Sequence, residues 1–312
     1  MSNDMSQIKR FQIIGLKNYR NVNVIFKEPY KILVGENGLG KTTILDVFYY
    51  LLTRKWGSMD EIVFDFIELE LESELIEFSQ SELHIYVEYL EETKNYTDKC
   101  IIGKFENIEL TLDNLFKNRV VYFPIFRNIH QQLSPLLSYK YRNDLSSFLN
   151  RKLFDKETKE ILRETVMEFN MNSLKEMFLE NIGTDNLVSF KEICNAYLEE
   201  TRFMNSDQTG LEIINTNNNE KIDLQYLSSG EKQIINIFSK FYFSKRNDLI
   251  LLIDEPEMSL SIAWQSKLLP DIISSQNCSF LFAITHSPFI FSNDLTKYAE
   301  GLDIYISKRP NA

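Results

Sequence analysis

The segment KILVGENGLGKT, residues 31–42, decides the fold class of this 312-residue chain. Residues 31–34 form a short, mostly apolar run that ends at a glycine, as a buried parallel strand does. Residues 35–42 match the pattern G-x-x-x-x-G-K-[ST], in which backbone N–H groups wrap around phosphates. Residues 43–52 continue as a mostly apolar helix whose positive N-terminal end faces those phosphates. The sequence therefore predicts a strand, a phosphate-binding loop and a helix in succession, which is the centre of an α/β fold.

The loop residues predict how ATP and Mg²⁺ are held. Lys41 is expected to reach the β- and γ-phosphates, and Thr42 to supply its hydroxyl to Mg²⁺. The remaining loop residues predicted to bind the nucleotide are Asn37, Gly38, Gly40 and Thr43.

A second motif, LILLIDE at residues 249–255, is an aliphatic run that ends in two acids. It predicts a buried parallel strand that delivers both carboxylates to its C-terminal edge, where ligands bind in open α/β sheets. Asp254 is placed to bind Mg²⁺, directly or through water. Glu255 is placed to polarise the attacking water as general base.

Two further segments complete a nucleotide site. Residues 228–231, Ser-Ser-Gly-Glu, precede a helix, and hydroxyls and N–H groups at a helix start bind anions. In isolation this segment is only a good helix cap, but its place upstream of the acidic strand favours a binding role for Ser229 and Gly230. His286 follows the last predicted strand and is expected to contact the γ-phosphate and sense its loss, because imidazole titrates near neutrality.

The composition is that of an ordinary globular protein, with 44% hydrophobic and 25% charged residues. No apolar run approaches the ~20 residues that a membrane span needs, and residues 1–10 lack the apolar core of a signal peptide. Cys100, Cys194 and Cys278 are widely spaced, as free thiols in a reducing compartment are. We therefore expect a cytoplasmic protein without a membrane partner.

The negative charge is concentrated in one stretch. Residues 56–93 contain twelve Asp and Glu residues and no Lys or Arg, in a chain of net charge −11. Two interpretations stay open: a solvated acidic face, or a docking surface for a basic partner. No basic cluster is dense enough to indicate DNA binding, although the acidity does not exclude it.

The order of predicted elements indicates one discontinuous α/β core, residues 1–129 and 208–312, with an inserted helical lobe at 130–207. Strands are predicted near residues 11–14, 22–26, 31–34, 62–71, 83–90, 99–105, 120–123, 248–253 and 279–284. A hairpin is predicted at 211–224. Beyond the helix after the phosphate loop, helices are predicted near 143–152, 156–168, 172–179, 189–203 and 233–243.

These motifs, in this order, resemble the ATP-binding-cassette ATPases of the SMC/RecF class, especially the overcoming-lysogenisation-defect and related phage-defence AAA-family ATPases. The resemblance covers about residues 1–55 and 220–295. It implies a P-loop ATPase fold of the ABC type, with a mixed sheet and an N-terminal antiparallel β part. It also implies ATP hydrolysis in a head-to-tail dimer, in which Ser229 contacts the γ-phosphate of ATP held by the opposite protomer. Residues 259–261 match the loop that follows the acidic strand in that group.

Two arginines enter through the resemblance. Arg20 matches an arginine that lies close to the nucleotide in the SMC/RecF group, although a structural surface role fits nearly as well. Arg127 ends a Pro-x-x-Arg element near the place of the glutamine loop of transporters, and the spacing does not decide among Arg127, Gln131 and Gln132 for that role.

Two departures from the family shape the functional prediction. The insertion is too short for a long coiled coil. Only about 25 residues follow His286 in this sequence, and we expect no nuclease domain in so short a segment. We therefore expect an ATPase switch that controls a separate effector protein in bacterial anti-phage defence. The alternative is a DNA-clamping ATPase without an effector, and direct binding of nucleic acid stays open. A transporter subunit is disfavoured by the insertion and by the sequence around Asp254.

Overall fold

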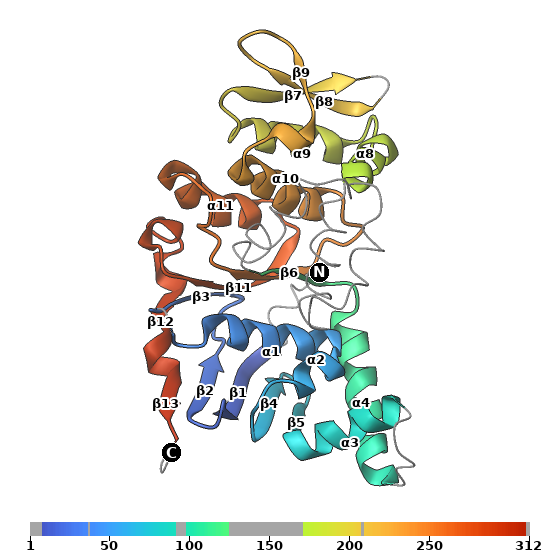
Figure 1. The fold of residues 1–312 in the computed structure, drawn as a ribbon, viewed down its shortest axis with the longest axis vertical. Coiled ribbons are helices and arrows are strands. Elements are labelled where there is room, and N and C mark those ends of the chain that lie inside the picture. Colours follow the sequence, from blue (N-terminus) through green and yellow to red (C-terminus); the bar gives the residue numbers. More distant parts are fainter. Residues whose placement is uncertain (1–7, 37, 92–97, 125–170, 207–208, 310–312) are drawn as a thin grey trace, which may run out of the picture. The chain divides into compact units, whose positions relative to one another are not determined.

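The computed structural model describes residues 8–36, 38–91, 98–124, 171–206 and 209–309 (Figure 1). The chain divides into two compact units. The first comprises residues 1–124, 248–256 and 278–312, and the second comprises residues 125–247 and 257–277. Among the described residues, no helix is both long and apolar enough to cross a membrane.

One sheet of the first unit is antiparallel throughout. Its strands, in spatial order, are β13 (Ile306–Lys308), β2 (Arg20–Ile25), β1 (Ile8–Leu16), β4 (Phe66–Leu71) and β5 (Leu75–Ser79). Buried and more exposed residues alternate along β4, as expected for a strand with one face on the core. The predicted N-terminal antiparallel part is thereby confirmed.

The other sheet of the first unit is parallel throughout. Its strands, in spatial order, are β12 (Ala299–Gly301), β3 (Tyr30–Val34), β11 (Cys278–Thr285), β10 (Leu249–Asp254) and β6 (Val120–Phe123). Every residue of β10 is buried, which explains its unbroken aliphatic sequence. The α/β fold class is confirmed, with antiparallel and parallel strands in separate sheets.

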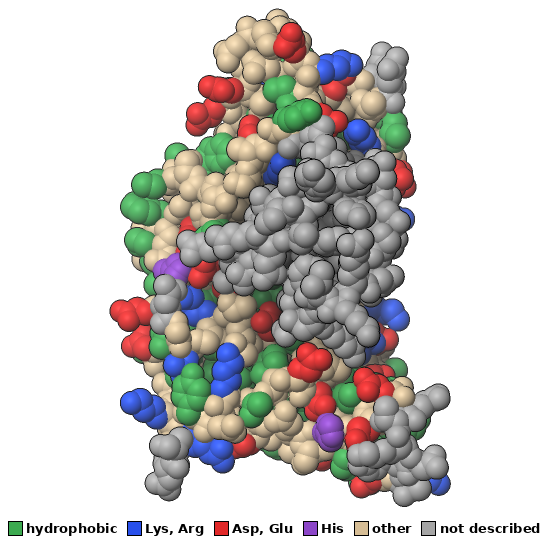
Figure 2. Space-filling model, viewed as in Figure 1, with side chains coloured by type: hydrophobic (Ala, Val, Ile, Leu, Met, Phe, Trp, Pro, Cys, Tyr) green, Lys and Arg blue, Asp and Glu red, His purple; other side chains and the backbone are tan. Residues whose placement is uncertain are grey.

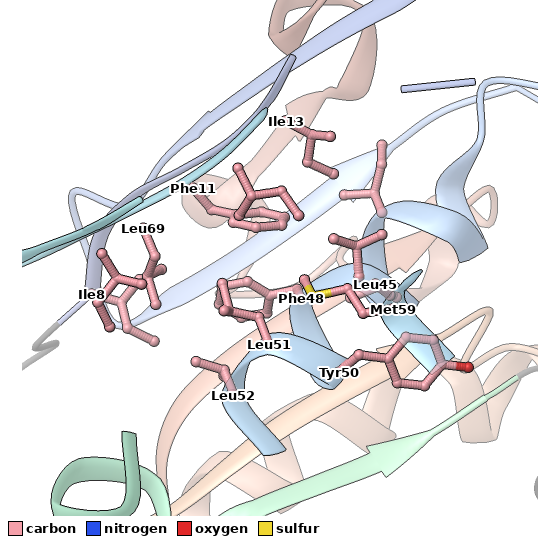
Figure 3. Packing of buried hydrophobic residues seen from close by; sticks show 14 of the residues in the cluster. Ile8, Phe11, Ile13, Leu45, Phe48, Tyr50, Leu51, Leu52, Met59 and Leu69 are labelled. Carbon is pink, nitrogen blue, oxygen red and sulfur yellow. The ribbon is translucent and has the colours of Figure 1, made fainter. Parts of the chain in front are cut away.

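Helix α1 (Lys41–Thr53) lies in the core between these sheets and buries residues on most of its circumference. Phe48 shows this best, because its ring lies 4.8 Å from the ring of Phe11 on β1 and 5.5 Å from that of Phe282 on β11. Figure 3 shows Phe48 among Phe11, Leu51 and other apolar side chains. Burying a side chain of this size contributes roughly 1.5–3 kcal/mol. This packing anchors the helix that begins at the phosphate loop.

Two predicted strands are wrong and are helices. Residues 83–90 lie in α3 (Gln80–Leu90), and residues 99–105 begin α4 (Lys99–Phe116). The buried residues of α4 are Phe105, Ile108, Leu112 and Phe116, a helical spacing that continues past the predicted strand. Helix α3 begins with a capping box between Ser79 and Glu82, a signal of a helix start. A short helix, α2 (Trp56–Asp60), follows α1.

The acidic stretch lies on these elements, and Figure 2 shows Asp and Glu side chains gathered over β4, β5 and α3. Several carboxylates are paired with cations. Arg10 forms ion pairs with Glu68 and Glu70, and Lys104 with Glu82. Part of the stretch is therefore a solvated face with its charge locally compensated.

The second unit combines helices with a small sheet. Its described helices are α8 (Met171–Glu180), α9 (Asp185–Asn195), α10 (Ser229–Tyr242) and α11 (Ile262–Ser274). Its strands are β7 (Thr201–Ser206), β8 (Gly210–Asn215) and β9 (Lys221–Ile222), which pair antiparallel in that order. The predicted hairpin is confirmed.

The predicted helix at 189–203 is only partly right. It ends at Asn195, and Thr201–Ser206 is a strand in which Phe203 is buried while Arg202 and Met204 are exposed. That alternation is the period of a strand. The predicted helices at 143–152 and 156–168 lie outside the described residues, so the lobe boundaries at 130–207 stay a prediction.

Candidate nucleotide-binding site

The parallel sheet brings three separate segments of the first unit to one edge. Strand β11 lies between β3 and β10, with Thr285 opposite Val34 and Ile284 opposite Asp254. The chain leaves these strands at Gly35, Glu255 and His286, and because the strands are parallel these exits share an edge. The Gly35 N–H donates to the Thr285 carbonyl at 3.2 Å, and the Glu255 N–H donates to the Ile284 carbonyl at 2.8 Å. The edge is therefore held by backbone hydrogen bonds.

The phosphate loop has a conformation that needs glycine. Gly38 and Gly40 have φ values of 83° and 80°, in the left-handed region that favours glycine. Gly40 is the N-cap of α1, and the start of this helix carries neither a side-chain cap nor an acidic residue in its first turn. The first amides of α1 therefore lack a side-chain acceptor of their own and suit an anion. Thr43 lies in that first turn, and Asn37 lies outside the described residues.

Lys41 is held at the loop. Lys41 is only 6% exposed, and its ammonium donates to the carbonyls of Gly35 at 3.1 Å and Glu36 at 3.2 Å. A buried cation needs such partners, because desolvating a charge is costly. The arrangement keeps the ammonium beside the loop, where phosphate oxygens would be its ligands.

The predicted metal ligands lie in direct contact. The Thr42 hydroxyl donates to Asp254 Oδ2 at 2.5 Å, and Asp254 is 3% exposed. Mg²⁺ prefers oxygen ligands and is usually bound by one or two protein groups together with phosphate oxygens and water. A hydroxyl beside a carboxylate therefore fits Mg²⁺ in the presence of ATP.

Glu255 and His286 form a second contact at the same edge. His286 Nε2 lies 2.9 Å from Glu255 Oε1, and His286 Nδ1 lies 3.4 Å from the Lys41 ammonium. These contacts suit a neutral imidazole that donates from Nε2 to Glu255 and accepts at Nδ1 from Lys41. One ring therefore links the phosphate-loop lysine to the predicted general base.

Arg20 lies next to the loop. Its Nη1 atom is 3.4 Å from the point where a Cβ on Gly40 would stand, and its guanidinium stacks over Tyr19 at 4.6 Å. The position is compatible with a nucleotide contact. Arg127, Gln131 and Gln132 lie outside the described residues.

Ser229 and Gly230 belong to the second unit, at the start of α10. Ser228 caps the helix in a capping box with Glu231, and Ser229 is exposed. A Cβ on Gly230 would overlap the backbone carbonyl of Ser259, so this position has no space for a side chain. The glycine is required by a close approach of two backbones.

One pair at the site was not anticipated. The Tyr122 hydroxyl donates to Asp46 Oδ1 at 2.8 Å, and Asp46 lies one turn after Thr42 on α1. The four-residue spacing, which puts Asp46 and Thr42 on one helix face, was the available signal in the sequence. Its partner on β6 is fixed only by the tertiary structure.

Comparison with known proteins places the chain in a family. The model of the AAA ATPase domain matches residues 7–182, and that of the AAA domain, putative AbiEii toxin, Type IV TA system, matches residues 101–292. Each match spans more than half of the sequence. The chain therefore belongs to the AAA ATPase domain family.

Individual relatives are more distant. The chain is 25% identical over 339 residues to the Septu protein PtuA of Bacillus thuringiensis, covering 98% of this chain and 80% of that protein. It is 32% identical over 108 residues to the DNA replication and repair protein RecF of Desulfitobacterium hafniense strain Y51, covering 33% of this chain and 27% of RecF.

Two solved structures align over most of the chain. An SMC head bound to the C-winged helix domain of ScpA aligns over 92% of both chains, with a TM-score of 0.46 and 14% identity. The SMC head domain of Thermotoga maritima aligns over 95% of this chain and 94% of that chain, with a TM-score of 0.44 and 12% identity.

Proposed function

We propose that this chain binds and hydrolyses ATP, dimerises head-to-tail around it, and acts as a switch for a separate effector in anti-phage defence. The observation that carries the ATPase part is the convergence of Lys41, Thr42, Asp254, Glu255 and His286 at one sheet edge. The similarity to Septu protein PtuA over 98% of the chain supports the context of defence. The resemblance to phage-defence ATPases supports it as well.

Nucleotide binding follows from the loop and Lys41. The ammonium exchanges the Gly35 and Glu36 carbonyls for phosphate oxygens, while the first amides of α1 bind the phosphates. Thr42 and Asp254 would hold Mg²⁺. The metal, when bound, offsets the negative charge of the triphosphate.

Hydrolysis needs a base, and Glu255 is the group placed for it. Its carboxylate takes the proton of the attacking water, and His286 holds that carboxylate through the 2.9 Å contact. The same imidazole lies beside Lys41, so a change in the phosphates at Lys41 reaches Glu255 through one ring. This geometry suits a switch that responds to loss of the γ-phosphate.

Dimerisation rests on the segment at the start of α10. Ser229 is exposed at a helix N-terminus, and helix N-termini attract anions. In the proposed dimer this end approaches the γ-phosphate of ATP held by the second copy. The two copies then form two equivalent sites, as two-fold symmetry requires.

The Glu255→Gln variant tests the proposal. It should bind ATP, lose on the order of 100-fold or more in hydrolysis because the base is gone, and persist as a dimer with ATP and Mg²⁺. Size-exclusion chromatography with light scattering measures the dimer, and phosphate release measures turnover. Glu61→Gln, at an exposed residue of the first unit, is the control and should behave as the unchanged protein. A monomer at saturating ATP would contradict the switch.

A DNA clamp without an effector is the second candidate, because the RecF match reaches 32% identity over 108 residues. Affinity purification of the Glu255→Gln protein from its host, with ATP and Mg²⁺, separates the two. A stoichiometric second polypeptide supports the effector switch. Nucleic acid alone, with binding that falls steeply as salt rises, supports the clamp.

A further inference from the structure

A tyrosine–carboxylate pair lies within the first unit beside the two predicted metal ligands. The Tyr122 hydroxyl donates to Asp46 Oδ1 at 2.8 Å, and the Thr42 hydroxyl donates to Asp254 Oδ2 at 2.5 Å. Each hydrogen bond joins α1 to a strand of the parallel sheet, the first to β6 and the second to β10. The two hydrogen bonds therefore join one helix to two neighbouring strands.

The register explains why the attachments lie close together. Tyr122 pairs with Leu252 in the parallel β6–β10 ladder, and Asp254 is two residues beyond Leu252. Side chains two residues apart on a strand share a face, and directly paired residues of neighbouring strands do so too. Tyr122 and Asp254 therefore point to the same face, the one on which α1 lies. On α1, Thr42 and Asp46 are one turn apart and also share a face.

The electrostatics agree with this placement. Burial raises the pKa of Tyr122 well above its usual value, and the charges of Asp46 and Asp254 raise it further. The phenol therefore stays protonated and remains a hydrogen-bond donor at physiological pH. The phenol thereby keeps its hydrogen bond to the Asp46 carboxylate.

The ring of Tyr122 provides a second hold on α1. It packs against the ring of Tyr49, three residues after Asp46, with centroids 4.8 Å apart. The Lys55 ammonium also lies over the Tyr49 ring, 4.8 Å from its centroid. Tyr122 thus contacts the helix through both its hydroxyl and its ring. A Phe in its place would keep the ring contact and lose only the hydrogen bond.

We propose that Tyr122 and Asp46 are positioning residues of the nucleotide site, whose hydrogen bond holds α1 against the sheet so that Thr42 and Asp254 stay at the spacing that Mg²⁺ needs. The inference rests on the proposed function, since it takes Mg²⁺ and ATP as ligands. Mg²⁺ tolerates little departure from its preferred geometry, so a small displacement of one ligand matters. Lys41 and the first amides belong to α1 itself, so they move together with the helix and keep their spacing for the phosphates when this hydrogen bond is lost.

The test is equilibrium binding of a fluorescent ATP analogue, measured in EDTA and across a Mg²⁺ titration. Tyr122→Phe and Asp46→Ala should each raise the Mg²⁺ concentration for half-maximal enhancement about tenfold, the lower end of the loss seen when groups that orient metal ligands are removed. Binding in EDTA should stay unchanged. Asp46→Asn keeps an oxygen that accepts from Tyr122 and should stay within about twofold of the unchanged protein.

Tyr86→Phe is the matched control. Tyr86 is a buried tyrosine of the first unit that also hydrogen bonds to a carboxylate, that of Glu109. It should lose stability without a change in Mg²⁺ dependence. If Tyr122→Phe fails to fold, the comparison of Asp46→Ala with Asp46→Asn decides the question alone.

Three results would overturn the inference. The first is an unchanged Mg²⁺ dependence in Tyr122→Phe. The second is an equal loss of binding with and without Mg²⁺, which would make the pair merely structural. The third is an Asp46→Asn variant as defective as Asp46→Ala, which would make the charge rather than the hydrogen bond the important property. Failure of the unchanged protein to bind the analogue at all would instead refute the proposed function.

Discussion

At the scale of single residues, the backbone of Glu255 shows how the site is built. Its φ of 47° lies in the left-handed region, which costs a residue other than glycine about 1–2 kcal/mol. The hydrogen bond from the Glu255 N–H to the Ile284 carbonyl holds this conformation directly after β10. The turn directs the carboxylate to His286. Strain of this kind persists where the surrounding structure enforces it, which is common at active sites.

Lys41→Ala should weaken ATP binding at least tenfold, because charge-assisted hydrogen bonds contribute about 1.5–3 kcal/mol. Isothermal titration calorimetry with ATP and Mg²⁺ measures the loss. Lys99→Ala removes an exposed lysine at the start of α4 and should bind normally. Undiminished ATP hydrolysis in Lys41→Ala would show that the loop is wrongly assigned.

At the scale of elements, the helix starts differ in how they are capped. Helices α3 and α10 begin with capping boxes that use their own serine and glutamate side chains. Helix α1 begins at Gly40 without a side-chain cap. A helix start without its own acceptor is suited to an external anion. The start of α10 has, besides its capping box, a close approach of Gly230 to the Ser259 carbonyl.

Gly230→Ala should destabilise the protein by about 1–3 kcal/mol, because the added methyl group overlaps a backbone carbonyl and forces a backbone shift. Urea unfolding measures the change. Gly103→Ala is the control, since Gly103 lies within α4 and a Cβ there meets no atom within 4 Å. That control should stabilise by about 0.5–1 kcal/mol. Equal stability of the two variants would contradict the packing argument.

At the scale of the whole molecule, the phosphate loop and the α10 start belong to different compact units. The parallel sheet assembles Lys41, Asp254 and His286 within one unit, whereas Ser229 lies in the other. In the proposed dimer, a complete site draws the loop from one copy and Ser229 from the other. The damage caused by a Ser229 variant should therefore fall on the partner's nucleotide.

Ser229→Arg should bind ATP within about twofold of the unchanged protein, because Lys41 and the loop amides remain, and lose tenfold or more in hydrolysis. Mixing it with Glu255→Gln before adding ATP should restore part of the activity, since one site of the mixed dimer is intact. Phosphate release measures both effects. Ser274→Arg, at an exposed position at the end of α11, is the control. Normal turnover in Ser229→Arg would contradict a shared site.

The sequence by itself determined the local parts: the strand, loop and helix around Lys41, the buried acidic strand, and the helix start at Ser228. Each is encoded by residues adjacent in the chain, whose pattern of apolar and polar side chains sets the element. Residues 83–90 and 99–105 misled the strand prediction because a short apolar run fits a strand or a helix. Only the capping residues and the longer helical period separate the two.

Only the tertiary structure decided which distant residues meet. The strand order β3–β11–β10–β6 places Lys41, His286, Glu255 and Tyr122 near one another in the first unit. Lys41 and His286, which are in contact, are 245 residues apart in the sequence. That order depends on which apolar faces bury one another, and such pairings leave no local pattern in a single sequence. The Tyr122–Asp46 hydrogen bond and the Gly230–Ser259 approach follow from the same long-range packing.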